Sequence, residues 1–159
     1  MDEVEDQLAR LLPRLRRFAH GLARDPADAD DLLQATAERI LKSRGSWQAG
    51  TNFAAWAYRV MRNMWIDMAR TRQRQDRGRA AEEEGLSVGI GGDAEARVEL
   101  AYLMRALTQL PNEQREAVVL VMIEEFSYAE AAQILDIPIG TLTSRLVRGR
   151  QALLALLED

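Results

Sequence analysis

The sequence contains no cysteine, and its only histidine is His20. The absence of cysteine excludes disulfides, thiolate catalysis and cysteine-based zinc sites, and one histidine cannot build a multi-histidine metal site. There is also no glycine-rich loop of the kind that cradles phosphates, so no catalytic constellation is recognisable. We therefore expect a protein that is not an enzyme and that needs no metal or other cofactor.

Long apolar segments are missing as well. No run approaches the roughly 20 residues that a helix needs to cross a bilayer. The first residues, MDEVEDQ, are acidic and lack the basic start and apolar core of a secretion signal. These features predict a cytoplasmic protein that does not insert into a membrane.

The charge shows no basic excess, since the net charge is −4 over 159 residues. A protein that binds DNA by itself usually carries such an excess, because neutralising phosphates supplies most of its non-specific affinity. Here the arginines are concentrated locally instead. Hydrophobic residues make up 47% of the chain, too many for a disordered protein. Because β-branched residues are sparse beside alanine, leucine, arginine and glutamate, the composition favours an all-α fold.

The sequence pattern divides the chain into two small helical domains, residues 1–72 and 94–159. The stretch between them, residues 73–93, lacks apolar periodicity and ends rich in glycine, which is typical of a flexible linker. In the first domain, Asp25 followed by Pro26 predicts a helix start. This helix should run to about Arg44 and bury Leu33, Ala37, Ile40 and Leu41.

A longer helix of the first domain should begin at a cap formed by Thr51 or Asn52. Its apolar residues recur at three- and four-residue steps, and we interpret the resulting face as core. These residues are Phe53, Trp56, Ala57, Val60, Met61, Met64 and Met68. Polar residues, among them Arg59, Arg62, Asn63 and Arg70, fall largely elsewhere on the helix.

The second domain should open with a helix near Ala94 whose apolar residues are Val98, Leu100, Leu103, Met104 and Leu107. Leu110 and Pro111 interrupt this pattern, and Pro111 suits the start of another helix. The apolar residues of that helix should be mostly buried, namely Ala117, Val118, Leu120, Val121 and Met122.

Residues 126–154 have the spacing of a helix-turn-helix. Ser127 and Glu130 predict a capping box at the start of a short helix. This helix should stop at residues 136–138, DIP, because proline cannot continue it. A second helix then begins near Gly140 and should bury Leu142 and Leu146.

The second helix of this motif carries hydroxyl and guanidinium groups near its N-terminal half. Arg145 can bond both acceptors of a guanine edge, and the hydroxyls can reach phosphates or other bases. The candidate DNA-binding residues are Thr141, Thr143, Ser144, Arg145 and Arg148. A plain helical hairpin with a solvated arginine face is the alternative.

Several segments together resemble the extracytoplasmic-function (ECF) sigma factors of bacterial RNA polymerase. Residues 126–132, FSYAEAA, and 137–146, IPIGTLTSRL, resemble region 4 of that family. Residues 28–34, DADDLLQ, 50–56, GTNFAAW, and 62–67, RNMWID, resemble its region 2. The chain departs from the family in having Ala35 and Ala37 where glutamate and an aromatic are common, and Asp136 where the turn usually has glycine. A further departure is Gly149, which lies inside the recognition helix, where glycine costs about 1 kcal/mol relative to alanine.

This resemblance implies a region 2-like helical bundle and a region 4-like helix-turn-helix, and a role in promoter-specific transcription initiation, in a stress or envelope response. The first domain would bind core RNA polymerase through Asp28, Asp30, Asp31 and Gln34. It would read and melt the −10 element through Asn52, Arg59, Arg62, Asn63 and Arg70. The second domain would read the −35 element of promoter DNA. An anti-sigma factor is a further expected partner.

Three other functions remain open at this stage. A sigma mimic that only sequesters an anti-sigma factor would share the fold, but it should lose the polar face of the recognition helix. A dimeric helix-turn-helix repressor would not explain the first domain, and an enzyme would need a catalytic constellation. Asp28, Asp30 and Asp31 could also merely complement the N-terminus of their helix. Trp47 is interpreted as a packing residue, and the arginines from Arg74 onward as a solvated helix end and linker.

Overall fold

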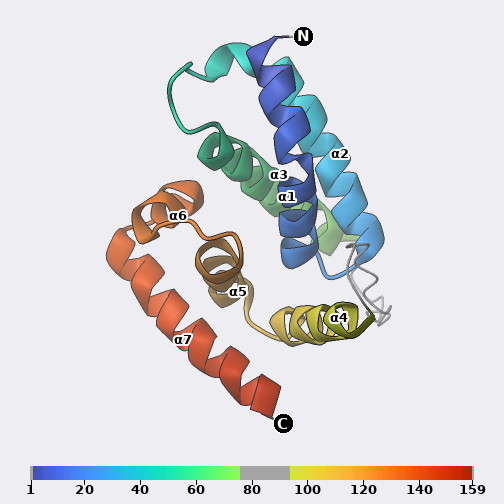
Figure 1. Ribbon diagram of the computed structural model, residues 1–159, viewed down its shortest axis with the longest axis vertical. Helices are drawn as coiled ribbons and strands as arrows, with labels where there is room; N and C mark the ends of the chain where they lie inside the picture. The colour runs from blue at the N-terminus through green and yellow to red at the C-terminus, as the bar shows by residue number, and fades with distance from the viewer. Residues whose placement is uncertain (1, 76–93, 159) are drawn as a thin grey trace.

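The computed structural model describes residues 2–75 and 94–158, and helices account for all the regular structure there, with no β-strand (Figure 1). The predicted all-α fold is therefore confirmed. The elements are α1 (Glu3–Leu22), α2 (Pro26–Lys42), a 3₁₀ turn (Arg44–Ser46), α3 (Phe53–Gln75), α4 (Ala94–Thr108), α5 (Asn112–Val118), a π-helical turn (Val119–Ile123), α6 (Tyr128–Leu135) and α7 (Ile139–Glu158).

Residues 2–75 form the N-terminal half and residues 94–158 the C-terminal half. Helix α3 continues to Gln75, past residue 72. The rest of the predicted linker lies outside the described residues, and so does the mobility expected there. The domain bounds 1–72 and 94–159 stay a prediction.

The N-terminal half is a bundle in which α1, α2 and α3 pack against one another. Asp25 begins α2 as predicted, because its carboxylate accepts a hydrogen bond of 2.8 Å from the backbone N–H of Ala27, and Pro26 is the first helical residue. Asp2 caps α1 in the same way, accepting from the backbone N–H of Glu5 at 2.8 Å. Local capping chemistry therefore fixes where both helices start.

The predicted buried face of α2 is only partly right. Ile40 is buried, whereas Leu33, Ala37 and Leu41 are half-buried, and the helix ends at Lys42, before Arg44. The residues that are fully buried share a neighbouring face, namely Ala29, Leu32, Thr36 and Ile40. Because α2 packs against α1 and α3 together, the face between those two contacts is the one that becomes inaccessible.

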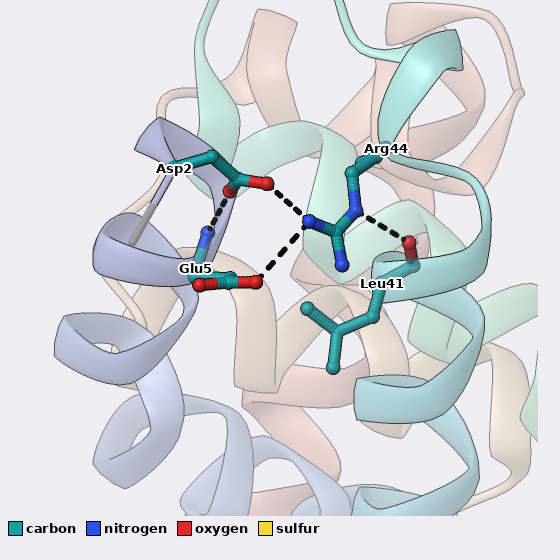
Figure 2. Close-up of polar contacts among 4 residues, drawn as sticks. All are labelled: Asp2, Glu5, Leu41 and Arg44. Carbon is teal, nitrogen blue, oxygen red and sulfur yellow. Dashed lines mark hydrogen bonds and ion pairs between the residues drawn. The ribbon is translucent and has the colours of Figure 1, made fainter.

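Arg44 fastens the end of α2 to the start of α1 (Figure 2). Its guanidinium donates to the carboxylates of Asp2 and Glu5, and its Nε donates to the carbonyl oxygen of Leu41 at 2.9 Å. These hydrogen bonds hold the 3₁₀ turn that leads into the loop before α3. In that loop, the ring of Trp47 packs edge-on against Phe53 with centroids 5.4 Å apart, as expected of a packing residue.

Helix α3 starts at a cap formed by Asn52, whose side-chain oxygen accepts from the backbone N–H of Ala55 at 3.2 Å. The predicted apolar stripe faces the core, with Phe53, Ala57 and Met61 fully buried and the remaining residues half-buried. The sequence pattern missed Tyr58, which is completely buried on this helix.

The C-terminal half contains the predicted helices, but two of their apolar residues lie on the surface. Val98 of α4 is 67% exposed and Met122 is 46% exposed, whereas Ala117, Val118 and Leu120 are buried, so the helix after Pro111 is mostly buried as predicted. Met122 lies in the π-helical turn, Val119–Ile123. The residues that α5 and this turn do bury are Arg115, Glu116, Ala117, Val118, Val119 and Leu120.

The helix-turn-helix has the predicted geometry. Ser127 and Glu130 form the capping box, with the Ser127 hydroxyl accepting from the Glu130 N–H at 3.1 Å and the Glu130 carboxylate accepting from the Ser127 N–H at 3.0 Å. Asp136 ends α6 in the left-handed region at φ 55°, where a short polar side chain is tolerated. Leu142 and Leu146 of α7 are buried as expected.

Gly149 allows α7 to cross α5 closely. A β-carbon at this position would lie 2.8 Å from Cγ2 of Val118 and 3.0 Å from the carbonyl oxygen of Gln114. The glycine that looks costly in the sequence therefore marks a helix crossing that leaves no room for a methyl group.

The two halves pack directly on each other. Helix α6 lies against α3, and both α4 and α5 contact α1. Aromatic rings continue the core across the junction, because Tyr58 stacks on Phe18 with centroids 4.7 Å apart and meets Phe126 edge-on at 4.8 Å. One apolar core thus runs through both halves.

Candidate nucleic-acid interface

The predicted −35 residues lie within three turns of the start of α7. Ser144 and Arg148 are exposed, and Thr141 and Thr143 are half-buried. The Thr143 hydroxyl donates to the carbonyl oxygen of Ile139 at 2.9 Å, so its proton is used within the helix and its lone pairs stay available. The guanidinium of Arg145 lies 3.7 Å from the carboxylate of Glu113 on α5.

The predicted −10 residues line α3 and the loop before it. Asn63 and Arg70 are exposed. The other three contact acidic side chains of the C-terminal half. Asn52 donates to Glu130 at 2.7 Å, Arg59 lies 3.9 Å from Asp136, and Arg62 lies 3.5 Å from Glu116. The structure thus brings most of this set against the helix-turn-helix.

Glu116 occupies a nearly closed position on α5, with 5% of its surface exposed. Burial raises the pKa of this carboxyl, and the positive charges of Arg62, Arg115 and Arg145 oppose that shift. The buried carboxylate of Glu116 therefore interacts electrostatically with Arg62, from the predicted −10 residues, and with Arg145, from the predicted −35 residues.

Arg115 is the largest fully buried side chain among the described residues. Its guanidinium donates to the carbonyl oxygen of Leu22 at 3.0 Å and to the Asn112 side chain at 2.6 Å. Burial lowers its pKa to about 10, and the charge of Arg24 adds to the shift. This arginine ties α5 to the C-terminal end of α1.

A second buried carboxylate, Glu124, joins the halves at the aromatic junction. Its side chain has no exposed surface. It accepts from the hydroxyl of Tyr58 and, at 2.6 Å, from Nε of Arg17. Burial and the neighbouring carboxylate raise the pKa of Tyr58, and the hydrogen bond to Glu124 raises that of Arg17. Arg14 completes the cluster, with its guanidinium 5.5 Å from the centre of the Tyr58 ring.

The predicted polymerase-binding residues differ in their exposure to solvent. Asp30, Asp31 and Gln34 are exposed along one side of α2. Asp28 is only 15% exposed at its side chain and forms an ion pair with Arg72 of α3. Because Asp28 has a partner within the N-terminal half, the exposed acidic groups of this set are Asp30 and Asp31, and Gln34 adds an exposed amide beside them.

The side chains that connect the two halves were not predicted from the sequence. Tyr58, Arg17, Glu116 and Glu124 attract no notice as isolated residues, and their partners are about 50 or more positions away. One signal was present: Glu124 directly follows the apolar run VVLVMI, and a carboxylate at the end of a buried segment needs a partner.

Within residues 2–75 and 94–158, no group of three acidic or histidine side chains is placed to hold a metal ion. The helices of this part of the chain are all too short or too polar to cross a membrane. His20 is buried with neither ring nitrogen hydrogen-bonded to another described residue, and its Nε2 lies 4.0 Å from Asp30.

Comparison with known proteins gives matches in both halves. Residues 8–75 match the family model of sigma-70 region 2, and residues 100–153 match that of sigma-70 region 4. The ECF RNA polymerase sigma factor EcfG of Rhodopseudomonas palustris (strain TIE-1) is 36% identical over 156 residues, which cover 98% of this chain and 86% of EcfG.

Two further proteins are similar over nearly the whole chain. The RNA polymerase sigma factor CarQ of Myxococcus xanthus is 33% identical over 99% of this chain and 91% of its own length. Among solved structures, the sigma factor RpoE of Bartonella quintana, in complex with the anti-sigma factor NepR, superposes with a TM-score of 0.87. Its sequence identity is 34%, and the match covers 99% of this chain and 98% of RpoE.

Proposed function

The chain belongs to the extracytoplasmic-function (ECF) family of RNA polymerase sigma factors, and we propose which of its residues bind core polymerase and which bind each promoter element. It is a sigma factor that binds core RNA polymerase and directs transcription initiation. The family is one of transcription regulators, and we propose that this chain catalyses no reaction of its own. Its place of action would be the cytoplasm, with the polymerase, and its promoters would serve a stress or envelope response.

The recognition helix α7 would read the −35 element. The observation that carries this assignment is the combination of a left-handed turn at Asp136 with exposed polar side chains on the first turns of the helix. In a helix-turn-helix, those turns enter the major groove. Arg145 would bond a guanine edge, while Ser144 and Arg148 would contact bases or phosphates. Thr141 and Thr143 would add hydroxyl contacts.

Helix α3 and the loop before it would bind the −10 element. An unpaired strand needs cationic groups along its backbone and a surface for an unstacked base. Arg59, Arg62 and Arg70 supply the charge, and Asn52 and Asn63 supply amide groups for hydrogen bonds. Asp30, Asp31 and Gln34 on α2 would contact core polymerase, with Asp28 holding α2 against α3.

An anti-sigma factor is a proposed partner, since the similar sigma factor RpoE was solved with one. The rival interpretation, a sigma mimic without DNA binding, needs neither the exposed Ser144 nor the exposed Arg148. A dimeric repressor leaves the acidic surface of α2 without a role.

The test uses paired charge variants in a reconstituted holoenzyme. Promoters are recovered by transcribing sheared genomic DNA with core polymerase and this chain. Arg145→Ala should lose roughly 1–3 kcal/mol of promoter discrimination, as for a lost bidentate base contact, with core binding unchanged. Asp31→Arg should weaken core binding, because it reverses a charge on the docking surface.

Matched controls keep the same chemistry on the same helices. Arg150→Ala removes another exposed arginine of α7, and Glu38→Arg reverses another exposed acid of α2; neither should have the corresponding effect. Wild-type promoter selectivity in Arg145→Ala would refute the recognition-helix assignment. Normal core binding in Asp31→Arg would refute the docking assignment and favour the sigma mimic.

A further inference from the structure

Arg145, which is proposed to bond a guanine edge, lies beside an acidic side chain of another helix. Its Nη2 is 3.7 Å from Oε1 of Glu113 on α5, and the two side chains are 23% and 71% exposed. We infer that Glu113 is a positioning residue for base recognition, which holds the Arg145 guanidinium toward the base edges and away from the phosphates. The inference rests on the proposed role of Arg145 at the −35 element.

The two helices that carry this pair are held in a fixed relation. Helices α5 and α7 pack on each other (Figure 1), and they cross closely at Gly149, where a β-carbon would lie 3.0 Å from the carbonyl oxygen of Gln114. Gln114 directly follows Glu113, and Gly149 lies about one turn after Arg145. The close crossing therefore fixes the backbone of both partners, and side chains on rigid elements are positioned more precisely than side chains on loops.

A second carboxylate acts on the same arginine. Glu116 lies one turn after Glu113 on α5 and is 5% exposed. The positive charge of Arg145 opposes the rise in the pKa of this buried carboxyl, so the two groups interact. Arg145 is thus attracted to α5 by two acids, one buried and one exposed.

A carboxylate partner can orient a guanidinium without using up its donors. The guanidinium carries five N–H donors, whereas the N7 and O6 acceptors of guanine need two. A long arginine side chain without such a partner can turn from a base edge to a phosphate, and a phosphate contact carries no sequence information. Glu113 attracts the guanidinium and repels phosphates near it. The pair therefore favours base contact over backbone contact.

The simpler role for Glu113 is local. It lies in the first turn of α5, where the helix dipole stabilises an acidic side chain. An exposed ion pair contributes little to folding by itself. The two roles predict different results: a charge at a helix terminus acts on stability and so on all DNA sequences equally, whereas a positioning residue acts on one base pair through Arg145.

The experiment measures base preference in the holoenzyme. The probe is one promoter recovered with the wild-type chain, in which each base pair of the −35 element is varied in turn. Holoenzyme in limiting amount selects from this library, and the bound DNA is sequenced. Arg145→Ala identifies the base pair that Arg145 reads, as the position at which the preference is lost.

Glu113→Gln removes the charge and nearly retains the size of the side chain. We expect it to reduce the guanine preference at that base pair about 1.5- to 5-fold, the range of an exposed ion pair, because Arg145 loses its orientation. Templates with a mismatch there should bind at least as tightly as they bind the wild type, since an element that repels phosphates is gone. In the Arg145→Ala background, Glu113→Gln should cause no further change at this base pair.

Glu95→Gln is the matched control. Glu95 is an exposed acid in the first turn of α4, so its replacement removes the same charge from the start of another helix in the same half. The guanine preference should stay at the wild-type value. Fluorescence anisotropy of single labelled templates gives the absolute affinities, and circular dichroism verifies that each variant is folded.

Three outcomes would overturn the positioning role while Arg145→Ala still loses its preference. They are a guanine preference in Glu113→Gln equal to that of Glu95→Gln, a uniform loss of affinity for all templates, and a further change at the same base pair in the Arg145→Ala background. If Arg145→Ala itself leaves every base preference unchanged, the proposed function fails and the positioning role fails with it. The Arg145→Ala result therefore distinguishes the two failures.

Discussion

Replacement of Gly149 by alanine should destabilise the protein although the residue lies in the middle of a helix. Alanine is favoured over glycine in a helix interior by about 1 kcal/mol. At this position the new methyl group would lie 2.8 Å from Cγ2 of Val118 and 3.0 Å from the carbonyl oxygen of Gln114. The Gln114 oxygen belongs to the backbone of α5, so relief requires α5 and α7 to move apart.

The expected magnitude follows from these opposing effects. Overpacking a close contact costs typically about 1–3 kcal/mol, and the backbone contact places Gly149 near the upper end. Subtraction of the gain in helix propensity leaves a net loss of about 2 kcal/mol. For a chain of this size the loss corresponds to a decrease in Tm of roughly 4–8 °C.

Gly140 provides the internal control on the same helix. A β-carbon there meets nothing within 4 Å, so Gly140→Ala should be neutral or stabilise by roughly 0.5 kcal/mol. Urea and thermal unfolding, followed by circular dichroism, measure the stability of both variants. If Gly149→Ala is as stable as Gly140→Ala, the close crossing of α5 and α7 is refuted.

Two further predictions concern local interactions. Burial lowers the pKa of His20 below the ordinary 6.5, so as the pH falls the unfolded chain is protonated first and the stability of the fold should decrease. In His20→Gln, the slope of Tm between about pH 7 and pH 5 should be shallower than in the wild type. An unchanged slope would contradict the lowered pKa of His20. Ser127→Ala should cost about 1 kcal/mol by removing the capping oxygen of α6, whereas Ser127→Thr should retain most of the stability, and equal urea midpoints for the two variants would argue against the capping box.

Features that depend on neighbouring residues could be predicted from the sequence. The start of α2 at Asp25, the capping box at Ser127 and the left-handed turn at Asp136 need only a few adjacent positions. The buried face of α2 was partly mispredicted, since it depends on where α1 and α3 lie. Gly149 was interpreted as destabilising the helix, because a local sequence pattern cannot show that another helix packs closely against this position.

The interaction between the halves could not be predicted. Asn52 and Glu130 are 78 positions apart, and each has an obvious local role as a helix-capping residue. Nothing in either motif indicates that the two side chains meet. Similarly, Arg59 and Arg62 fit an exposed DNA-binding face equally well whether or not carboxylates cover them.

The π-helical turn at Val119–Ile123 makes the position of Glu124 depend on chain length as well as on residue identity. The backbone N–H of Glu124 bonds to the carbonyl oxygen of Val119, five residues back, at 2.9 Å. Such a turn is equivalent to one residue inserted into an α-helix. Deletion of a single residue here would restore α-helical spacing and rotate the following side chain by about 100°, away from Tyr58. A one-residue gap in a homologue at this position would therefore remove the contact even where the glutamate itself is retained.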